Sequence, residues 1–449
     1  MQKIYIRNLG PINKVELDIN KFNLLIGEQA TGKSTIAKSI YFFRLIKTNV
    51  IDYLCQICDG ANYPNAGMEK SMCIKTLRSQ FKKIFVRLFG NSWNLKSDMH
   101  LKYFFTDEIW VEVKLKSGHK QYLSVSFSHQ LNNNINELEK QVREIYSNSE
   151  STITSIAFAN AERMRNHEEI TRSVNEIFED DLETYYIPAG RSLLTTMANS
   201  KSAIVAAGKD MDLVTEQFML IIDNIRNNFK QGIALAHKQY PDGSRRYDIS
   251  KIVEELQEIL HGDYRFENGK EFLEIDDKTY NNGRIEINFA SSGQQEILWL
   301  INYLYILILR KEKAFVIIEE PEAHIYPSMQ KKVMELISLF ANINDSKVLI
   351  TTHSPYILNS VNNLYYAGVL CNENLSNKVE KIISKNKIIE CGNLSAYKIQ
   401  RENGQNAEVS DLFEDNKREI KSYLIDEISS EFNKVYTELY SLELDSLGE

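Results

Sequence analysis

Three short strings in the sequence combine residue types that suit phosphate chemistry. Residues 27–35, GEQATGKST, hold two glycines in a polar loop that ends in a lysine and two hydroxyl side chains. Residues 315–320, FVIIEE, end an apolar run in two carboxylates, and residues 348–353, VLITTH, end another in a histidine. Glycine lets a backbone wrap a phosphate, lysine neutralises its charge, and carboxylates hold a cation or polarise water. Together the strings predict a site that binds and hydrolyses a nucleoside triphosphate.

The first string has the strand, loop and helix context that a P-loop requires. Residues 15–27, VELDINKFNLLIG, precede it as a strand, and residues 36–46, IAKSIYFFRLI, follow it as a helix. The amino terminus of that helix would offer free N–H groups and a positive dipole end to an anion. The predicted nucleotide-binding residues of the loop are Gly27, Glu28, Gln29, Ala30, Thr31, Gly32, Lys33, Ser34 and Thr35.

Three loop residues have specific predicted roles. Lys33 would reach the β- and γ-phosphates, Ser34 would ligate Mg²⁺, and Thr35 would bond an α-phosphate oxygen. Gly27 and Gly32 would let the main chain approach a phosphate closely.

The carboxylates after residue 318 lie where the carboxyl end of a buried strand would meet the P-loop. We expect Glu319 to hold Mg²⁺, directly or through water, and Glu320 to polarise the attacking water. His353 would hydrogen-bond the γ-phosphate or that water. The alternatives are a solvated acidic turn before Pro321 and a capping or structural histidine.

Bulk properties narrow the class of protein. At 449 residues and 43% apolar composition, one large α/β domain with an inserted or appended smaller one is expected. The longest apolar run, residues 297–309, contains Asn302 and is too short to span a bilayer. The amino terminus has no apolar signal core, so we expect a cytoplasmic protein. A net charge of −8 argues against binding nucleic acid over the whole surface, although a local basic patch remains possible.

The five cysteines are typical of a reducing compartment. Cys55 and Cys58, with Cys73 nearby, raise the possibility of a metal site or a zinc hook. The simpler interpretation is two cysteines one turn apart on a helix.

The ordered motifs resemble the ABC-type ATPase heads of SMC and RecF proteins and, more closely, the OLD-like ATPases of the AAA15 group. The resemblance rests on NLGPINKVELDI with the P-loop, then SSGQQ (291–295), VIIEEPEAHIYP (316–327) and ITTHSP (350–355). It covers roughly residues 1–48 and 284–360. It implies an α/β fold, a P-loop NTPase of ABC/SMC-head type, with a mixed sheet flanked by helices and a largely helical insertion.

In that family SSGQQ is the signature motif, so the resemblance assigns Ser291 and Gly293 to the γ-phosphate of an ATP held by another protomer. Gln294 matches the signature glutamine, whereas Ser292 stands where glycine is commoner. Glu319 stands where the usual motif has aspartate, which lengthens its reach to Mg²⁺. A plain helix cap by Ser291 or Ser292 is the competing interpretation.

The resemblance implies an ATPase that dimerises around two ATP molecules, each gripped by Lys33 of one protomer and Ser291 of the other. Such closure would act on a separate effector, a toxin or nuclease, in anti-phage defence. A nuclease of the OLD family would carry a Toprim domain after His353, with an isolated glutamate followed by a DxD pair. Fewer than 100 residues follow His353 and they contain no such pair, so we expect no nuclease activity in this chain. The alternative is a DNA-binding clamp of the RecF or SMC type, and an ABC transporter subunit ranks third.

We expect six segments. The ATPase head is formed by residues 1–49 and 283–375, with a return to the core sheet at 184–192. The other segments are an insertion at 50–183 with helices and a β-hairpin turning at 117–118, a helical insertion at 193–282, and carboxyl-terminal strands and a helix at 376–449. Strands are expected around 364–371 and 379–390. The final helix, at 425–442, would present an apolar stripe to the head or to a partner.

Some residues keep several interpretations. Arg191, in YYIPAGRS (185–192), would contact phosphate, nucleic acid or a core carboxylate. Gln56 and Gln80 are candidates for the glutamine that ABC proteins use near Mg²⁺. The basic face of the helix expected over 73–90 is solvated or contacts DNA or an acidic partner.

Overall fold

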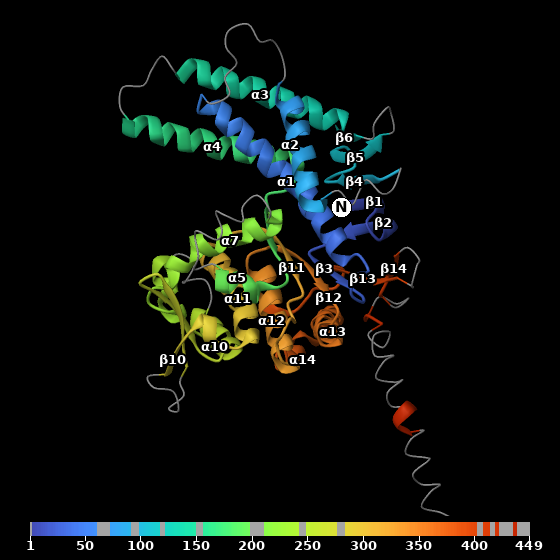
Figure 1. Ribbon diagram of the computed structural model, residues 1–449, viewed down its shortest axis with the longest axis vertical. Coiled ribbons are helices and arrows are strands. Elements are labelled where there is room, and N and C mark those ends of the chain that lie inside the picture. Colours follow the sequence, from blue (N-terminus) through green and yellow to red (C-terminus); the bar gives the residue numbers. More distant parts are fainter. Residues whose placement is uncertain are drawn as a thin grey trace, which may run out of the picture.

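The structure is a computed structural model, and it describes residues 2–60, 72–90, 98–116, 122–149, 156–197, 211–241, 248–275, 283–401, 407–413, 418–421 and 434–437 (Figure 1). Its core sheet has the strand order β14 (Glu408–Asp411), β13 (Leu394–Gln400), β3 (Phe22–Ile26), β12 (Lys347–Thr352), β11 (Ala314–Glu319) and β7 (Glu183–Ile187). Neighbouring strands are parallel, except that β13 and β14 are antiparallel. The expectation of an α/β fold with a mixed sheet is therefore confirmed.

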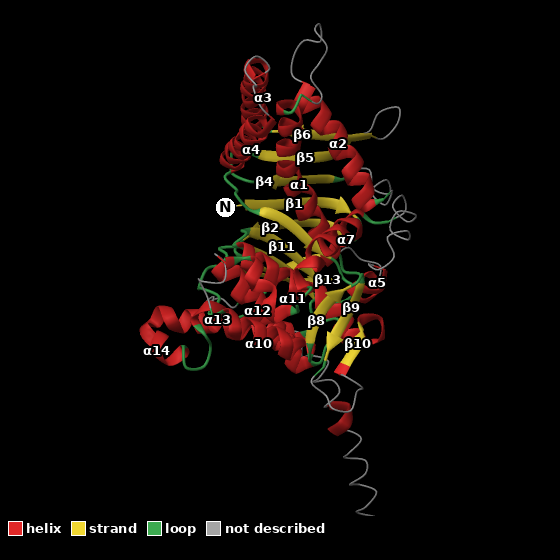
Figure 2. Ribbon diagram, turned by 90° about the vertical axis from the view of Figure 1, so that its left-hand side faces the viewer, coloured by secondary structure: helices red, strands yellow, loops and turns green. Residues whose placement is uncertain are grey.

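A second, antiparallel sheet has the order β2 (Ile12–Ile19), β1 (Gln2–Leu9), β4 (His100–Phe104), β5 (Trp110–Lys116) and β6 (Tyr122–Phe127). Figure 2 shows its strands stacked beyond the core sheet, with β6 farthest away. The expected hairpin is the antiparallel pair β5 and β6, whose turn lies outside the described residues. Because β4 pairs with β1, the strands of the segment 50–183 extend the amino-terminal hairpin and do not form a separate unit.

A third sheet consists of β8 (Asp263–Glu267), β9 (Lys270–Glu274) and β10 (Arg284–Glu286). The segment 193–282, expected to be helical, contains helices and also the strands β8 and β9. Asn268 and Gly269 connect β8 to β9, and both have positive φ, 51° and 78°. Asn-Gly is a strong signal for a two-residue hairpin turn, since both residues tolerate this left-handed backbone. The Asn268-Gly269 pair was therefore a sequence signal for the hairpin of β8 and β9.

Helices surround the sheets (Figure 1). They are α1 (Lys33–Cys58), α2 (Met72–Phe89), α3 (His129–Ser149), α4 (Ile156–Phe178), α5 (Arg191–Met197), α7 (Leu213–Ile225), α8 (Ile233–Ala236), α10 (Ile249–Leu260), α11 (Ser292–Arg310), α12 (Pro327–Ile343), α13 (Pro355–Leu370) and α14 (Ser376–Val379). The proposed division at residue 50 lies inside α1, which runs unbroken from the P-loop into the bundle of α2, α3 and α4.

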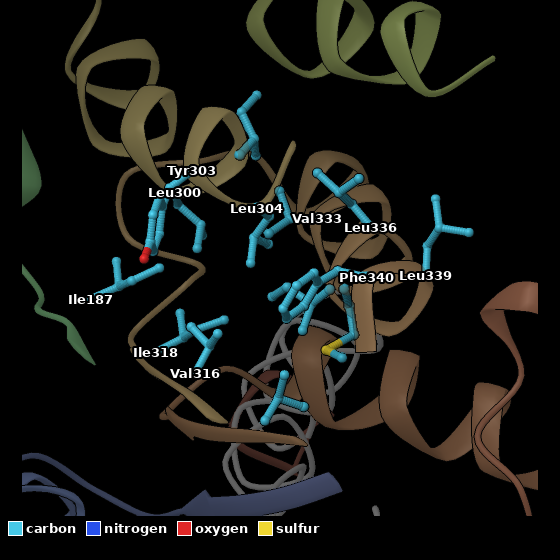
Figure 3. Close-up of a cluster of buried hydrophobic side chains, with 14 of the residues drawn as sticks. Ile187, Leu300, Tyr303, Leu304, Val316, Ile318, Val333, Leu336, Leu339 and Phe340 are labelled. Carbon is cyan, nitrogen blue, oxygen red and sulfur yellow. The ribbon is translucent and has the colours of Figure 1, made fainter. Parts of the chain in front are cut away.

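Both faces of the core sheet are buried, as a continuous apolar strand requires. On β11, Val316 and Ile318 face a core shared with α11 and α12, while Phe315 and Ile317 face a core shared with α1 and the antiparallel sheet. Figure 3 shows the first of these cores, where Leu304 of α11 and Phe340 of α12 lie over the strand. Among the described residues, no helix combines the length and apolar character needed to cross a bilayer.

The strands expected around 364–371 and 379–390 are wrong. Residues 355–370 form α13, because Ser354 caps that helix by accepting bonds from the N–H groups of Tyr356 (3.1 Å) and Ile357 (3.4 Å), and Pro355 occupies its first turn. Residues 379–390 hold the end of α14 and a 3₁₀ turn, Lys385–Lys387.

Among the described residues, the last two strands are β13 and β14. Of the apolar stripe expected at 425–442, only residues 434–437 belong to the described part of the chain. They are helical, and Val435 is 53% exposed and Tyr436 69% exposed.

Candidate nucleotide site

The P-loop connects β3 to α1 and encloses its own lysine. Lys33 is 6% exposed, and its ammonium donates to the carbonyl oxygens of Gly27 (2.7 Å) and Glu28 (2.6 Å). Thr31 donates to the same Glu28 oxygen at 2.9 Å and stabilises the turn. Glu28, Gln29 and Ala30 are exposed at the tip, where phosphates would arrive. The lysine is thus held at the position that a phosphate oxygen would share.

Two glycines of the loop are required by packing as well as by phosphate access. A Cβ atom on Gly27 would collide with the carbonyl oxygen of Ile399 on the neighbouring strand β13. Gly32 has φ of 110°, and a Cβ atom there would lie 2.5 Å from Cδ1 of Ile12. The loop is therefore wedged between β13 and the β1–β2 turn, and neither position has room for a side chain.

The carboxylates expected at the end of β11 lie at this same edge of the sheet. Glu319 is 6% exposed, and its Oε2 accepts a long hydrogen bond from the N–H of Ala189 at 3.4 Å. Glu320 adopts a left-handed backbone with φ of 43°, and its N–H donates to the carbonyl of Thr351 at 2.9 Å. Such a backbone is uncommon for a non-glycine residue and occurs often at functional sites.

His353, at the end of β12, faces these carboxylates. Its Nδ1 lies 3.7 Å from Oε1 of Glu320 and 3.5 Å from Oε1 of Glu322, and its side chain is 38% exposed. Ser354 caps the following helix, so the capping alternative for His353 does not describe its position. The imidazole is both near the carboxylates and open to a ligand.

Glu322 belongs to this site and was not predicted from the sequence. It is 5% exposed, and its Oε1 accepts hydrogen bonds from Oγ1 of Thr352 (2.6 Å) and from the N–H of His353 (2.9 Å). The available signal was a third carboxylate in the string EEPEAH, two positions after Glu320. Glu322 ties the loop after β11 to the loop after β12.

Charge around the lysine is strongly negative. Burial lowers the pKa of Lys33, while Glu320, Glu322, Glu319 and Glu28 oppose that fall, and the net pKa is below its ordinary value. These four carboxylates favour the charged ammonium by their attraction. The geometry therefore brings together the predicted P-loop, both predicted carboxylates and the predicted histidine.

The predicted signature residues form the amino terminus of α11. Ser291 caps the helix, with its Oγ accepting from the N–H of Gln294 at 3.3 Å and its own N–H donating to Oε1 of Gln294 at 3.1 Å. Gln294 also donates to the carbonyl of Leu260 at 2.8 Å. The plain helix cap is thus what Ser291 does within one chain.

The first residues of the same segment are exposed and are not bonded to the P-loop of the described chain. Ser291 and Ser292 are exposed, and among the described residues no hydrogen bond or ion pair joins residues 291–294 to the P-loop. A Cβ atom on Gly293 would lie 2.6 Å from the carbonyl oxygen of His324, so a close approach within the chain already requires this glycine.

A family comparison supplies the class of the protein. A family model described as AAA ATPase domain (AAA_15) matches residues 1–358. The chain belongs to this ATPase family. The matched span includes the P-loop, the carboxylates after β11 and His353. No curated protein sequence matches the chain.

Solved structures similar to this chain include SMC heads. They include an SmcHead bound to the C-winged helix domain of ScpA, with 12% identity, covering 92% of this chain and 98% of that one at a TM-score of 0.42. The SMC head domain from Thermotoga maritima has 8% identity, covering 91% and 97% at 0.36. A Smc head domain with an extended coiled coil, bound to the C-terminal domain of ScpA derived from Pyrococcus furiosus, has 12% identity, covering 92% and 96% at 0.38. The family assignment rests on the sequence match.

The residues around Lys33 fit a nucleotide-bound Mg²⁺. Oε1 of Glu319 and Oε2 of Glu322 are buried without a hydrogen-bond partner among the described residues, and Oε2 of Glu319 accepts a long bond from the N–H of Ala189. Ser34 is exposed at the start of α1. Ser34 and Glu319 would hold such an ion together with phosphate oxygens. The described residues contain no group of three or more His, Cys, Asp or Glu side chains that could hold a metal by themselves.

Arg191, whose partner the sequence left open, is completely buried at the start of α5. Its backbone N–H donates to Oε2 of Glu296 on α11 at 2.8 Å, and its Nε lies 3.4 Å from the same oxygen. Its guanidinium donates to the main-chain carbonyls of Glu319 (2.7 Å) and Glu320 (2.9 Å). Of the three partners predicted for Arg191, the one found among its described contacts is a core carboxylate, that of Glu296.

Two other expectations fall on helices away from the site. Gln56 lies near the end of α1, roughly 35 Å along the helix from Lys33 at 1.5 Å per residue, so it does not reach the metal position. Gln80 lies on α2, which packs on α1, α3, α7 and β6. Cys55 and Cys58 lie one turn apart on α1, and burial raises the pKa of Cys55 to about 12, which disfavours the thiolate that zinc binds.

Proposed function

We propose that this ATPase hydrolyses ATP to ADP and phosphate, with Glu320 polarising the attacking water. The observation that carries the proposal is the convergence of Glu319, Glu320 and Glu322 on the P-loop lysine. A cluster of carboxylates beside a lysine and an exposed imidazole suits phosphoryl transfer, in which positioning and charge provide most of the catalysis.

The chain's own groups would act in a definite order. On ATP binding, Lys33 would exchange the carbonyls of Gly27 and Glu28 for β- and γ-phosphate oxygens. Ser34 and Glu319 would hold Mg²⁺, which neutralises phosphate charge when bound. Glu320 would accept a hydrogen bond from the attacking water, and His353, 3.7 Å away, would donate to the γ-phosphate.

We further propose that two copies close around two ATP molecules, with Ser291 of each copy contacting the γ-phosphate held by the other. The support is the exposure of Ser291 and Ser292 at the amino terminus of a 19-residue helix, α11, whose dipole favours an anion. The resemblance to OLD-like ATPases supports a role in anti-phage defence, in which closure controls a separate toxin or nuclease.

The test of hydrolysis and dimerisation starts from Glu320→Gln. This variant should bind ATP, lose turnover by roughly 10²- to 10⁴-fold, and elute with ATP and Mg²⁺ as a dimer or higher oligomer in size-exclusion chromatography with light scattering. Unchanged turnover and an unchanged mass would contradict the proposal.

A matched pair at Ser291 separates the helix cap from the phosphate contact. Asp and Asn both cap helices well, so Ser291→Asp and Ser291→Asn should both keep α11 intact. Only Asp would repel the triphosphate, so the dimer of Glu320→Gln should be lost with Ser291→Asp and retained with Ser291→Asn. ATP binding by the single chain should be the same in both, because Ser291 does not contact its own P-loop.

The effector is best sought by co-purifying the tagged Glu320→Gln protein with the products of neighbouring genes, with and without ATP. Nucleotide-dependent recovery of a toxin or nuclease supports the regulatory role. ATP turnover stimulated by DNA, with affinity falling steeply as salt rises, would favour a DNA clamp instead.

A further inference from the structure

We propose that Arg191 is a positioning residue that sets the backbone of Glu320 for hydrolysis and couples that backbone to the amino-terminal turn of α11 through Glu296. The inference rests on the proposed function, because it assigns Glu320 to catalysis and residues 291–293 to the ATP of a second copy. It concerns a different residue, which touches neither ATP in that scheme.

The backbone of Glu320 has an uncommon positive φ of 43°. A left-handed conformation at a glutamate persists only where the surroundings hold it. The N–H of Glu320 is bound by Thr351, and its carbonyl is bound by Nη2 of Arg191 at 2.9 Å. Nη1 of the same guanidinium donates to the carbonyls of Glu319 (2.7 Å) and Pro188 (2.9 Å). Arg191 therefore fixes two consecutive peptide groups at the point where β11 ends.

Hydrogen bonds also join the start of α5 to α11. Glu296 is 1% exposed and lies one helical turn after Ser292. Its side chain accepts from the backbone N–H of Arg191 at 2.8 Å, and its carbonyl accepts from Nε at 2.8 Å. Thr195, one turn further along α5, donates to the carbonyl of Gln295 at 2.9 Å. The start of α5 is thus bound to the first turns of α11, and a shift of α11 would move the guanidinium.

The guanidinium of Arg191 joins these two elements because of its shape. The guanidinium presents its donors in a rigid planar fork, and here they point to α11 and to the end of β11 at once. A lysine in its place has one nitrogen on a flexible stem and cannot reach both elements with this geometry. A ligand that pulls or presses on residues 291–293 would therefore change the position of Glu320 only while arginine is present.

The structure offers a matched control for the test. Arg44 is also buried, at 2% exposure, but it binds Asp180, Gln2 and Thr184, which are remote from the nucleotide site. Arg44→Lys and Arg191→Lys both remove a buried fork and retain the charge. A merely structural role predicts equal effects of the two substitutions on turnover per folded molecule.

The experiment measures ATP affinity, kcat and KM for the full chain with Arg191→Lys, Glu296→Gln, both together, and Arg44→Lys. We expect kcat to fall at least tenfold in Arg191→Lys, with ATP affinity and KM within about threefold of wild type and Arg44→Lys near wild type per folded molecule. Glu296→Gln should lower kcat less, and the double variant should be no worse than Arg191→Lys, because both act on one contact.

Each outcome decides between interpretations. Equal loss of kcat in Arg44→Lys and Arg191→Lys, or an unchanged kcat in Arg191→Lys, overturns the coupling. If Arg191→Lys does not fold, Glu296→Gln decides, since it keeps the size and an acceptor oxygen. If Glu320→Gln itself retains wild-type turnover, the proposed function fails; if Glu320→Gln is inactive and Arg191→Lys is fully active, only this inference fails.

Discussion

Arg44 on α1 and Arg191 on α5 are both closed off from solvent, yet they are neutralised in different ways. Arg44 makes a two-point contact with the Asp180 carboxylate, at 2.7 and 3.1 Å, and its guanidinium lies 4.3 Å from the Phe315 ring. Lys47 adds bonds to the carbonyls of Asp180 and Leu182. Arg191 pairs with one carboxylate, Glu296, and its guanidinium also donates to the main-chain carbonyls of Pro188, Glu296, Glu319 and Glu320.

The pKa shifts of the two arginines differ in the same sense. Burial lowers the pKa of both, but Asp180 outweighs burial at Arg44, whose net pKa is raised. At Arg191 the attraction of Glu296 and of the nucleotide-site carboxylates does not outweigh burial, and the net pKa is lowered. Both arginines pair with a buried carboxylate. We propose that the pair of Arg44 with Asp180 serves stability, whereas Arg191 positions the end of β11 through its bonds to the carbonyls of Glu319 and Glu320. The predictions below test that difference.

The largest effect on stability is expected from Asp180→Asn. Removing one partner of a buried pair leaves Arg44 and Lys47 without their counter-charge, which costs about 3–5 kcal/mol in the free energy of unfolding. Urea denaturation would measure the loss. ATP turnover per folded molecule should stay at the wild-type level, and a selective loss of turnover in a stable variant would break the comparison.

The pH dependence of that loss has a definite sign. Burial raises the pKa of Asp180, but Arg44, Lys47 and Gln2 lower it more, so the folded-state pKa is well below the ordinary value. A lowered folded-state pKa adds stability above the unfolded-state pKa of about 3.9, and that stability is lost as pH falls toward the folded-state pKa. The stability gap between wild type and Asp180→Asn should be full above about pH 5 and shrink below about pH 4. A gap independent of pH would contradict the assignment.

For Glu322→Gln we expect a loss of turnover with only a small loss of stability, which is the reverse of the expectation for Asp180→Asn. Glutamine keeps an acceptor for Thr352 and the N–H of His353 but removes a negative charge near Lys33 and His353. Turnover should fall roughly tenfold, as expected for one electrostatic group of a site, while stability changes less than in Asp180→Asn. Steady-state kinetics and thermal unfolding would show both. Wild-type turnover in this variant would remove Glu322 from the site.

The positions of the carboxylates and of His353 could be predicted because each follows a continuous apolar strand, and parallel strands end at one edge of a sheet. Glu322 could not, since its side chain is turned inward by bonds to the next strand's loop. The prediction of a strand at 364–371 is wrong because LYYAGVLC suits helix or strand by composition. The deciding signals were the cap Ser354 and Pro355 ten residues earlier.

The sequence by itself determined which residues follow the core strands β3, β11 and β12, because a P-loop, paired carboxylates and a buried apolar run are all local patterns. Only the tertiary structure decided what joins those ends. The pairing of β4 with β1 and the bonds from Arg191 to α11 and β11 each link segments about 90 or more residues apart. Such contacts depend on which surfaces pack together, and no local periodicity records that choice.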